Sequence, residues 1–439
     1  MIGSVTSRLP AAALAALALL THSVAEAKLV FAHYMVGTVT AGTGHAQTDI
    51  DQAISVGIDA FALNVGQPTA DFTLDTVSQL FDAADGTGFK LFFSFDFYQT
   101  GDLAAHKTLF DQYRDHPAHL TYGDGALPVV SSYSGGALGP DAWRAFKEEN
   151  GVYLLPNAEA DASYYDDPAA FFAAWGDALD GVLTWETAWP ETSETPLNVS
   201  SAQDEAIKAA ADAAGKTYVM GLSSVQYKHC CGDSWYRAGE TNLPERMDQI
   251  LSLSPEFTEI ITWNDAGESH YVGPCWAEGL PADILEYGNS DTNPHSGWQP
   301  LLSSFISAFK SGASTMAPPA GSSFAGAMWY RSATRACAGD VPRGAGAAVD
   351  AVNYAVVLPS SGAGYKVRVT SAGETLAEQP VGAGLSYNSV AGLRAGAQKI
   401  ELLDASGSVV ATAAGSVDAS DAPNEDGFCN YNYFVAGLQ

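Results

Sequence analysis

Asp265 and Glu268 are two carboxylic acids three residues apart, with Gly267 between them. Because glycine turns freely, this segment can direct both side chains into one cleft. One carboxyl group of such a pair can protonate a leaving oxygen, while the other activates a water molecule or attacks directly. This is the chemistry that cleaves a glycosidic bond, and Asp265 and Glu268 are therefore the predicted catalytic pair.

Polar and aromatic side chains follow most of the apolar runs of the chain and accompany this pair. Aromatic faces bind the apolar faces of sugar rings, while carboxylates and amides hold sugar hydroxyl groups. A cleft of this composition suits a neutral polymer such as a glycan. The residues predicted to bind substrate are His33, Tyr34, Asn64, Asp96, Trp185, Glu186, Trp235, Tyr236, Trp263, Asn264 and His270.

Structural roles also fit several of these residues. Asp265 could instead cap a helix start, with Glu268 completing a capping box. A carboxylate at a strand end can also cap the next helix or pair with Arg237. The residues open to such roles, or to burial in the core, are His33, Asp96, Trp185, Glu186 and Trp189.

Eight short, nearly continuous apolar runs would position these residues. They cover residues 29–36, 60–65, 90–95, 127–132, 152–156, 181–185, 217–222 and 259–263. Such runs indicate parallel strands covered on both faces. Amphipathic helix candidates lie between them, at residues 74–84, 103–113, 167–179, 201–214 and 243–253.

This alternation predicts a (β/α)8 TIM barrel, an α/β fold whose functional residues follow the carboxyl ends of the strands. An open doubly wound sheet ranks second, because no G-x-G-x-x-G turn follows the first strand. The pattern changes after residue 309, and residues 312–322 are rich in Pro, Gly and Ser, as in a linker.

Beyond the linker, short runs separated by Gly, Ser and Asp predict a small C-terminal antiparallel β-sandwich. These runs are residues 326–331, 351–358, 364–370, 398–403 and 408–413. We therefore expect a catalytic barrel over residues 28–312 and an accessory β-sandwich domain over residues 313–439.

Residues 1–27 have the pattern of a secretory signal peptide, with Arg8 before an apolar stretch and a small-x-small cleavage pattern ending at Ala27. No later segment is long and apolar enough to span a membrane. The 439 residues carry 50 acidic and 20 basic side chains, a net charge of −30, which excludes nonspecific binding to nucleic acid. The expected protein is a secreted monomer, extracellular or associated with a cell wall.

Five cysteines follow the predicted signal peptide, and an oxidising compartment favours disulfide bonds. We expect one bond between Cys337 and Cys429, and another between Cys275 and either Cys230 or Cys231. The histidine before the adjacent pair could suggest a metal site, but adjacent cysteines lack the two-residue spacing usual in zinc ligands. No metal ion and no organic cofactor is predicted.

The chain contains three longer motifs: residues 30–37 (Val-Phe-Ala-His-Tyr-Met-Val-Gly), 234–240 (Ser-Trp-Tyr-Arg-Ala-Gly-Glu) and 261–269 (Ile-Thr-Trp-Asn-Asp-Ala-Gly-Glu-Ser). Together with residues 57–64 and 93–96, they resemble fungal α-1,3-glucanases (mutanases) of glycoside hydrolase family 71. The likeness extends over residues 28–335 and is looser beyond them.

The resemblance implies a (β/α)8 barrel with a β-sandwich appendage, and hydrolysis of α-1,3-linked glucan in fungal walls or bacterial mutan. It also implies inversion at the anomeric carbon, with Asp265 and Glu268 as the catalytic pair. In the preferred assignment Glu268 is the general acid and Asp265 is the base that activates water. The reverse assignment is the alternative. Two alternative functions are compatible with the same residues. One is a glycosidase with the same barrel that cleaves a different glycosidic linkage, and the other is a non-catalytic protein that binds wall glucan.

Overall fold

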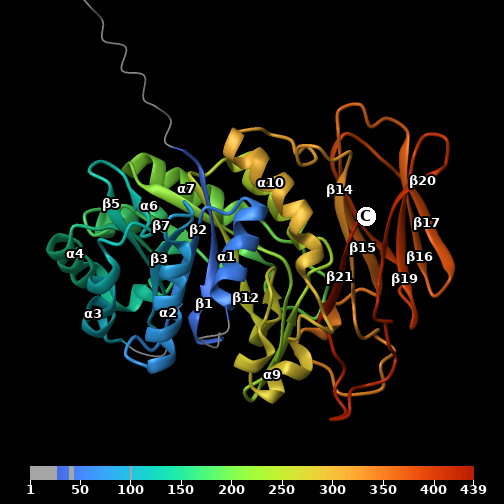
Figure 1. Ribbon diagram of the computed structural model, residues 1–439, viewed down its shortest axis with the longest axis horizontal. Helices are drawn as coiled ribbons and strands as arrows, with labels where there is room; N and C mark the ends of the chain where they lie inside the picture. The colour runs from blue at the N-terminus through green and yellow to red at the C-terminus, as the bar shows by residue number, and fades with distance from the viewer. Residues whose placement is uncertain (1–26, 39–43, 99–100) are drawn as a thin grey trace, which may run out of the picture.

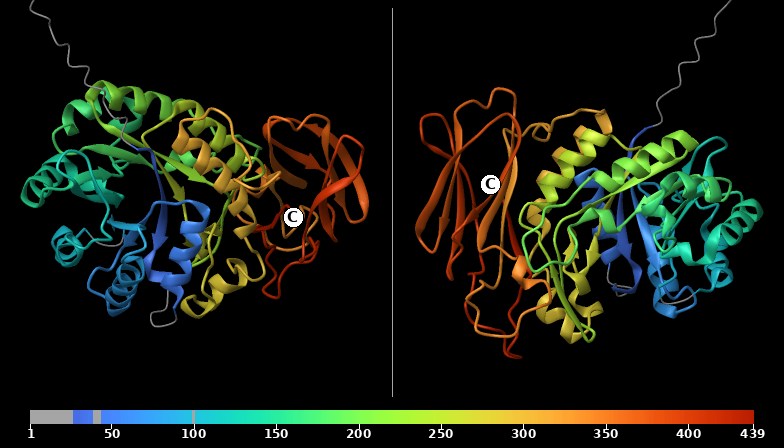
Figure 2. Two further views of the ribbon diagram at one scale, coloured as in Figure 1. Left: turned by 45° about the horizontal axis from the view of Figure 1, so that its top comes forward. Right: turned by 180° about the vertical axis from the view of Figure 1, so that it is seen from behind.

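The computed structural model describes residues 27–38, 44–98 and 101–439. The predicted signal peptide, apart from its last residue, lies outside the described residues. Within them the chain forms a curled sheet wrapped by helices, followed by two further sheets that lie to one side (Figures 1 and 2). None of the helices in these ranges has both the length and the hydropathy of a membrane span.

The first sheet has nine strands, and all but β4 run parallel. Its order is β4-β5-β3-β2-β1-β11-β8-β7, and β6 also pairs with β5. The parallel strands overlap the eight predicted apolar runs. The nine are β1 (Leu29–Met35), β2 (Ala60–Val65), β3 (Lys90–Asp96), β4 (Thr121–Tyr122), β5 (Leu127–Tyr133), β6 (Tyr153–Pro156), β7 (Gly181–Thr184), β8 (Thr217–Ser223) and β11 (Phe257–Ile261).

The sheet curls so far that its two outer parallel strands, β6 and β7, come together. Between them the described residues show one isolated bridge, from Asn157 to Leu183, where the other neighbours share continuous ladders. Both strands have four residues, and Pro156 at the end of β6 has no N–H to donate. The predicted closed barrel is therefore present in a coarser form, as a curled parallel sheet.

Helices follow the parallel strands and cover the outer face of the curl (Figure 1). Because both faces are covered, β2 is buried at every residue. The five predicted helices are confirmed, and α1, α4, α5, α9 and α10 are additional. The helices are α1 (His45–Val56), α2 (Asp71–Ala84), α3 (Leu103–Tyr113), α4 (Gly139–Asn150), α5 (Ser163–Asp166), α6 (Pro168–Trp175), α7 (Ala202–Ala214), α8 (Asn242–Leu253), α9 (Ala282–Tyr287) and α10 (Gln299–Ser311).

The inside of the curl is a packed core. The rings of Phe92 and Phe257 lie 4.9 and 5.2 Å from that of Phe31, measured between centroids. Trp185 and Trp189 belong to the same buried cluster, beside the carboxyl ends of the strands. A filled interior leaves those carboxyl ends as the place where a ligand can bind.

The C-terminal part consists of two four-stranded antiparallel sheets, ordered β18-β15-β14-β21 and β17-β16-β19-β20. Buried side chains from both sheets, among them Val352 and Ile400, form a core between them. The strands are β14 (Ala325–Arg331), β15 (Ala351–Leu358), β16 (Tyr365–Ser371), β17 (Glu374–Val381), β18 (Gly384–Ala391), β19 (Gln398–Leu403), β20 (Val409–Ala414) and β21 (Tyr433–Gly437). β17, β18 and β21 are additional to the five predicted strands.

The C-terminal sheets and the curled sheet share one continuous core. The ring of Trp298, just before α10, lies 5.9 Å from that of Trp329 in β14. The hydroxyl groups of Tyr236 and Tyr433 are 2.6 Å apart, and the Trp329 indole N–H donates to the Glu240 carbonyl at 3.0 Å. The C-terminal part therefore supports a segment that belongs to the first part of the chain.

Only one of the two predicted disulfide bonds is formed in the structure. Cys337 and Cys429 are bonded, as predicted. Cys230, Cys231 and Cys275 are unbonded, so the predicted bond from Cys275 is wrong. Cys275 is buried against the carbonyl of Asn264, whereas Cys231 is exposed and its sulfur lies 2.9 Å from that of Cys230.

Candidate active site

A cleft of about 410 Å³ opens at the carboxyl ends of the parallel strands. Its walls come from the ends of β1, β2, β3 and β5, from the residue after β7, from the hairpin of β9 (Gln226–Cys230) and β10 (Asp233–Arg237), and from the turn after β11. A neighbouring hollow of about 260 Å³ shares Met35, Asn64 and Asp96 with it. The predicted residues that line the cleft are His33, Asn64, Asp96, Trp185, Trp235, Asp265 and Glu268.

Asp265 and Glu268 lie in a short turn formed by β12 (Asn264–Asp265) and the 3-10 helix η4 (Ala266–Glu268). Asp265 Oδ1 accepts the Glu268 backbone N–H at 3.2 Å, so Asp265 does cap this turn. Glu268 does not complete a capping box, because the Asp265 N–H donates to Thr262 Oγ1 at 2.9 Å instead. The Glu268 carboxylate is thus available to the cleft.

The β9–β10 hairpin holds the Glu268 carboxylate. Gln226 Nε2 donates to Oε2 at 2.8 Å, and the Lys228 ammonium lies 3.7 Å from Oε1. Lys228 pairs across the hairpin with Trp235, and cross-strand partners share a face. One face of the hairpin therefore presents a cation, an amide and an indole to the site.

The two carboxyl groups differ in their electrostatic surroundings. Burial, and next the charge of Glu268, raises the pKa of Asp265 to about 7. Burial also raises the pKa of Glu268, but Lys228 and the Gln226 amide oppose this by favouring its anion. These surroundings favour a proton on Asp265 over a proton on Glu268.

The Asp265–Glu268 turn is anchored to the end of β1. The side chain of Asn264 accepts a hydrogen bond from the Met35 N–H through Oδ1 at 2.8 Å, and it donates one to the Met35 carbonyl through Nδ2 at 3.2 Å. The Trp263 N–H donates to the His33 carbonyl at 2.7 Å. These contacts with the backbone of β1 fix the position of the turn that carries Asp265 and Glu268.

His33 forms a buried pair with Glu259 at the floor of the cleft. Its Nδ1 lies 2.7 Å from Glu259 Oε1, and both side chains are almost fully buried. Its Nε2 is buried and has no hydrogen-bond partner among the described residues. The carboxylate thus orients the ring and leaves Nε2, beneath the cleft, as the nitrogen without a partner in the described part of the chain.

The 3-10 turn η3 (Glu186–Ala188) directly follows Trp185, which lines the cleft. The N–H groups of Trp185 and Glu186 donate to Glu159 Oε1 at 2.7 and 3.0 Å. Glu186 pairs with Arg237 at 3.1 Å, which is the structural alternative considered for this residue. The bonds to Glu159 and the Glu186–Arg237 pair hold the backbone around Trp185, whose side chain lines the cleft.

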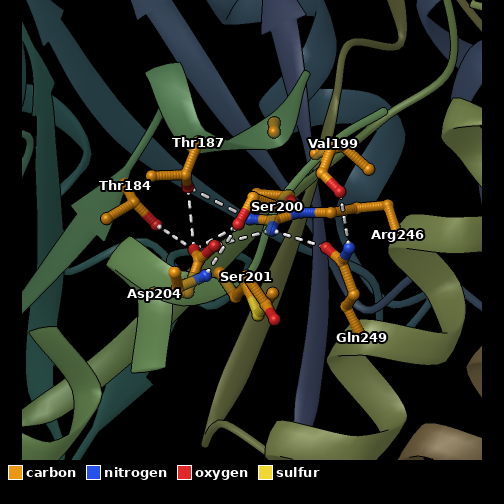
Figure 3. A network of polar contacts seen from close by, with 12 residues as sticks. Thr184, Thr187, Val199, Ser200, Ser201, Asp204, Arg246 and Gln249 are labelled. Atoms are coloured by element: carbon orange, nitrogen blue, oxygen red, sulfur yellow. Dashed lines mark hydrogen bonds and ion pairs between the residues drawn. The ribbon is translucent and has the colours of Figure 1, made fainter. Parts of the chain in front are cut away.

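An ion pair without solvent exposure lies beneath η3 (Figure 3). Arg246 Nη1 and Nη2 donate to the two Asp204 oxygens at 2.6 and 2.8 Å. Arg246 Nη2 also donates to Thr187 Oγ1 at 3.1 Å, and the Thr184 hydroxyl lies 3.4 Å from Asp204 Oδ1. Because Thr184 ends β7 and Thr187 lies in η3, this network fixes the segment that carries Trp185 and Glu186.

Residues 26–439 match the family model described as glycosyl hydrolase family 71. The chain belongs to glycosyl hydrolase family 71. This finding confirms the resemblance that the sequence motifs indicate.

Curated relatives agree with this family. A mutanase of Penicillium rubens is 32% identical over 99% of this chain and 94% of its own length. A glucan endo-1,3-alpha-glucosidase of Schizosaccharomyces pombe is 32% identical over 76% of this chain and 75% of its own length. A solved GH99 endo-alpha-mannosidase from Bacteroides thetaiotaomicron is similar in fold, with a TM-score of 0.51 at 14% identity over 64% of this chain and 97% of its own.

Several residues predicted to bind substrate in this family 71 chain lie away from the cleft. The Tyr34 hydroxyl donates to Asp49 in α1, and Tyr236 contacts Tyr433 at the C-terminal sheets. His270 is fully buried with Nε2 2.7 Å from the Ser223 hydroxyl, and burial holds its pKa well below the usual value. The predicted residues outside the cleft are Tyr34, Glu186, Tyr236, Trp263, Asn264 and His270.

Three residues that were not predicted lie in or beside the family 71 cleft: Lys228 and Tyr133 line it, and Gln226 donates to the Glu268 carboxylate. Lys228 and Gln226 belong to a hairpin that no predicted strand covers. Tyr133 ends β5, and burial raises its pKa well above the usual value, so it remains a neutral hydroxyl donor. Tyr133 could have been predicted from its position at the end of a strand. Gln226 and Lys228 could have been predicted from the alternation of side chains along β9.

Burying Asp265 should make the family 71 fold less stable once this group ionises. The penalty is absent below the unfolded pKa of 3.8 and complete above the folded pKa of about 7. We expect Asp265→Asn, which keeps the cap to the Glu268 N–H, to be more stable than the wild type by roughly 1–4 kcal/mol at pH 8 and equal to it at pH 3. Urea unfolding at both pH values measures this, with Asp82→Asn, at an exposed position of α2, as control. An equal difference at both pH values would contradict the burial argument.

Proposed function

We propose that this family 71 protein is an enzyme that hydrolyses the α-1,3-glucosidic bonds of α-1,3-glucan, as found in fungal walls and in mutan. The observation that carries the proposal is the Asp265–Glu268 pair, whose two carboxyl groups share one cleft and differ in their electrostatic surroundings. Membership of the family and the names of the relatives support the substrate. Trp185 and Trp235 add flat apolar faces for sugar rings in the same cleft.

The reaction would be a single displacement with inversion. Water attacks the anomeric carbon on the face opposite the leaving oxygen, and the basic carboxylate takes one proton from it. The other carboxyl group gives its proton to the leaving oxygen as the glycosidic bond breaks. His33, Asn64 and Asp96 would hold hydroxyl groups of the glucosyl unit.

The charge distribution in the free protein favours one assignment of the two roles. Burial raises the pKa of Asp265 to about 7, whereas Lys228 and Gln226 favour the Glu268 anion. Asp265 would then be the acid and Glu268 the base, which reverses the assignment that the sequence analysis places first.

The architecture and location of the enzyme complete the proposal. The curled sheet would be a (β/α)8 barrel over residues 28–312, with residues 313–439 as a β-sandwich domain. Cleavage after Ala27 would release a secreted monomer that acts on extracellular or wall glucan. Amino-terminal sequencing of the protein recovered from culture medium tests cleavage after Ala27. The mass of this protein in solution tests whether it is a monomer.

Incubation of the purified protein with insoluble α-1,3-glucan tests the activity, with products followed by NMR at early times. Release of β-anomeric glucose or oligosaccharides is expected, and it establishes linkage and inversion together. Release of α-anomeric products would replace inversion by retention. Binding without release would favour the wall-binding alternative, and release from another glucan alone would change the linkage.

Removing the cation beside the pair should move the pH profile of the enzyme. Lys228 lowers the pKa of both Asp265 and Glu268. In Lys228→Met both pKa values rise, so both limbs of the kcat/KM profile are expected to shift to higher pH by roughly one unit. Profiles on a soluble α-1,3-linked oligosaccharide measure the shift, and Lys228→Arg, which keeps the charge, should retain the wild-type profile. A Met variant with unmoved limbs would exclude this electrostatic role.

A further inference from the structure

Cys230 and Cys231 are adjacent residues at the turn of the β9–β10 hairpin. Their sulfur atoms are 2.9 Å apart, whereas nonbonded atoms as small as carbon pack about 3.5–4.0 Å apart. Cys231 has a left-handed backbone conformation, with φ 60°, which is uncommon for a residue with a side chain. The turn therefore holds two thiols against each other.

The cysteine count favours a bond between these two. Cys337 and Cys429 are bonded, which leaves three of the five cysteines. The third, Cys275, is buried, and burial raises its pKa well above the usual value. A bond between the adjacent pair would leave as the odd thiol the one that is shielded and unreactive.

We propose that Cys230 and Cys231 form a vicinal disulfide bond, and that this bond is part of the wall of the substrate cleft. Both residues line the cleft together with Asp265 and Glu268. The Cys230 sulfur lies 3.6 Å from the carbonyl of Gly267, inside the catalytic turn. The role in the cleft rests on the function proposed above, whereas the bond itself does not.

Oxidation replaces two polar thiols with an apolar disulfide that can contact the face of a glucosyl ring. It also ties the turn of the hairpin whose first strand carries Gln226 and Lys228. Because these two side chains hold the Glu268 carboxylate, a fixed turn keeps that carboxylate in place. The disulfide is therefore a positioning element for substrate and for Glu268.

The bond can form by exchange with the disulfide of a thiol–disulfide oxidoreductase. The exposed Cys231 thiolate attacks one sulfur of that disulfide and displaces a thiolate, giving a mixed disulfide. Cys230 then loses its proton, attacks the Cys231 sulfur and releases the second thiolate. The two cysteines lose two protons and two electrons in total, and the oxidoreductase disulfide becomes a dithiol. Burial raises the pKa of Cys230 to about 12, which agrees with Cys231 reacting first.

Alkylation of the denatured, unreduced protein tests the bond without any assay of activity. N-ethylmaleimide should add once per chain, at Cys275, and the Cys275→Ser variant should take up none. Trypsin releases residues 229–237 as one peptide that contains both cysteines, and it should be two hydrogens lighter than the dithiol. Maleimide on Cys230 and Cys231, or a peptide that links Cys275 to either of them, would overturn the proposal.

Mild reduction tests the role in the cleft. Neighbouring Cα atoms are about 3.8 Å apart, below the 4.4–6.8 Å usual in disulfides, so this bond should open before Cys337–Cys429. In the protein reduced at this bond alone, and in the double variant Cys230→Ser/Cys231→Ser, KM for an α-1,3-linked oligosaccharide should rise several-fold. An unchanged KM would refute the role in the cleft. An oxidised wild type that cleaves no α-1,3-glucan would refute the proposed function and leave the bond established by its mass.

Discussion

Replacing Asp265 by Asn, or Glu268 by Gln, should lower kcat on α-1,3-glucan by about 10²–10⁴-fold, the range that general acids and bases contribute. Both substitutions keep the size of the side chain and remove its ability to exchange a proton. The Asp265 cap to the Glu268 N–H and the Gln226 contact can be kept by the amides, so the fold should persist. Initial rates on a soluble α-1,3-linked oligosaccharide measure the loss.

The control for this prediction is Glu149→Gln, a substitution of an exposed carboxylate on α4, which should keep the wild-type rate. Circular dichroism of each variant shows that a lost rate is not lost structure. Near-normal turnover in either folded variant would remove that residue from the catalytic pair.

A substrate with a good leaving group separates the two roles. Departure of fluoride from an α-glucosyl fluoride needs little protonation, so the acid variant should recover much of its rate on such a substrate. The base variant should stay slow, because water still needs activation. Recovery in Asp265→Asn supports the assignment favoured by the charge distribution, and recovery in Glu268→Gln restores the reverse.

The parallel sheet was predictable because its strands are buried on both faces. Each such strand leaves a nearly continuous apolar run, and all eight runs correspond to strands. β17 and β18 of the C-terminal part are partly exposed along their length and so lack that signal. The break in the ladder between β6 and β7 goes with four-residue strands and with Pro156, which no periodicity reveals.

The residues of the site were harder to predict than its position, because neighbouring residues of a strand point in opposite directions. His33 lines the cleft, while Tyr34, one residue later, bonds to Asp49 on the outer face. Trp235 likewise lines the cleft, and Tyr236 turns to Tyr433. The motifs locate the strand ends, and only the register of β1 and of the β9–β10 hairpin decides which side chain enters the cleft.

The pairing of β9 with β10 explains why Lys228 and Gln226 were not predicted as site residues. Register pairs Lys228 with Trp235 and Gln226 with Arg237, which places all four on one face next to the carboxylates. Neither residue follows a predicted strand directly. The cation that favours the Glu268 anion therefore comes from an insertion between β8 and α8, and a barrel template alone does not locate it.

Breaking the buried Asp204–Arg246 pair should have the largest effect on stability. Arg246→Met removes all the guanidinium donors and leaves the Asp204 carboxylate without its cation in a site with no solvent exposure. Loss of one partner of a buried pair costs about 3–5 kcal/mol of unfolding free energy. Denaturant unfolding of the purified variant measures this loss. Lys208→Met on α7, which breaks pairs with the exposed carboxylates of Asp212 and Glu256, should cost less than about 1 kcal/mol per pair.

The double variant Asp204→Leu/Arg246→Met distinguishes a charge effect from a packing effect. Without either charge, the desolvation penalty of the orphaned carboxylate disappears, so the double variant should be more stable than Arg246→Met alone. A double variant that is less stable than the single one would show that packing, and not the unpaired charge, dominates. Activity should fall in Arg246→Met even where the protein is folded, because the Thr187 hydroxyl in η3 loses the donor that fixes the segment carrying Trp185 beside the cleft.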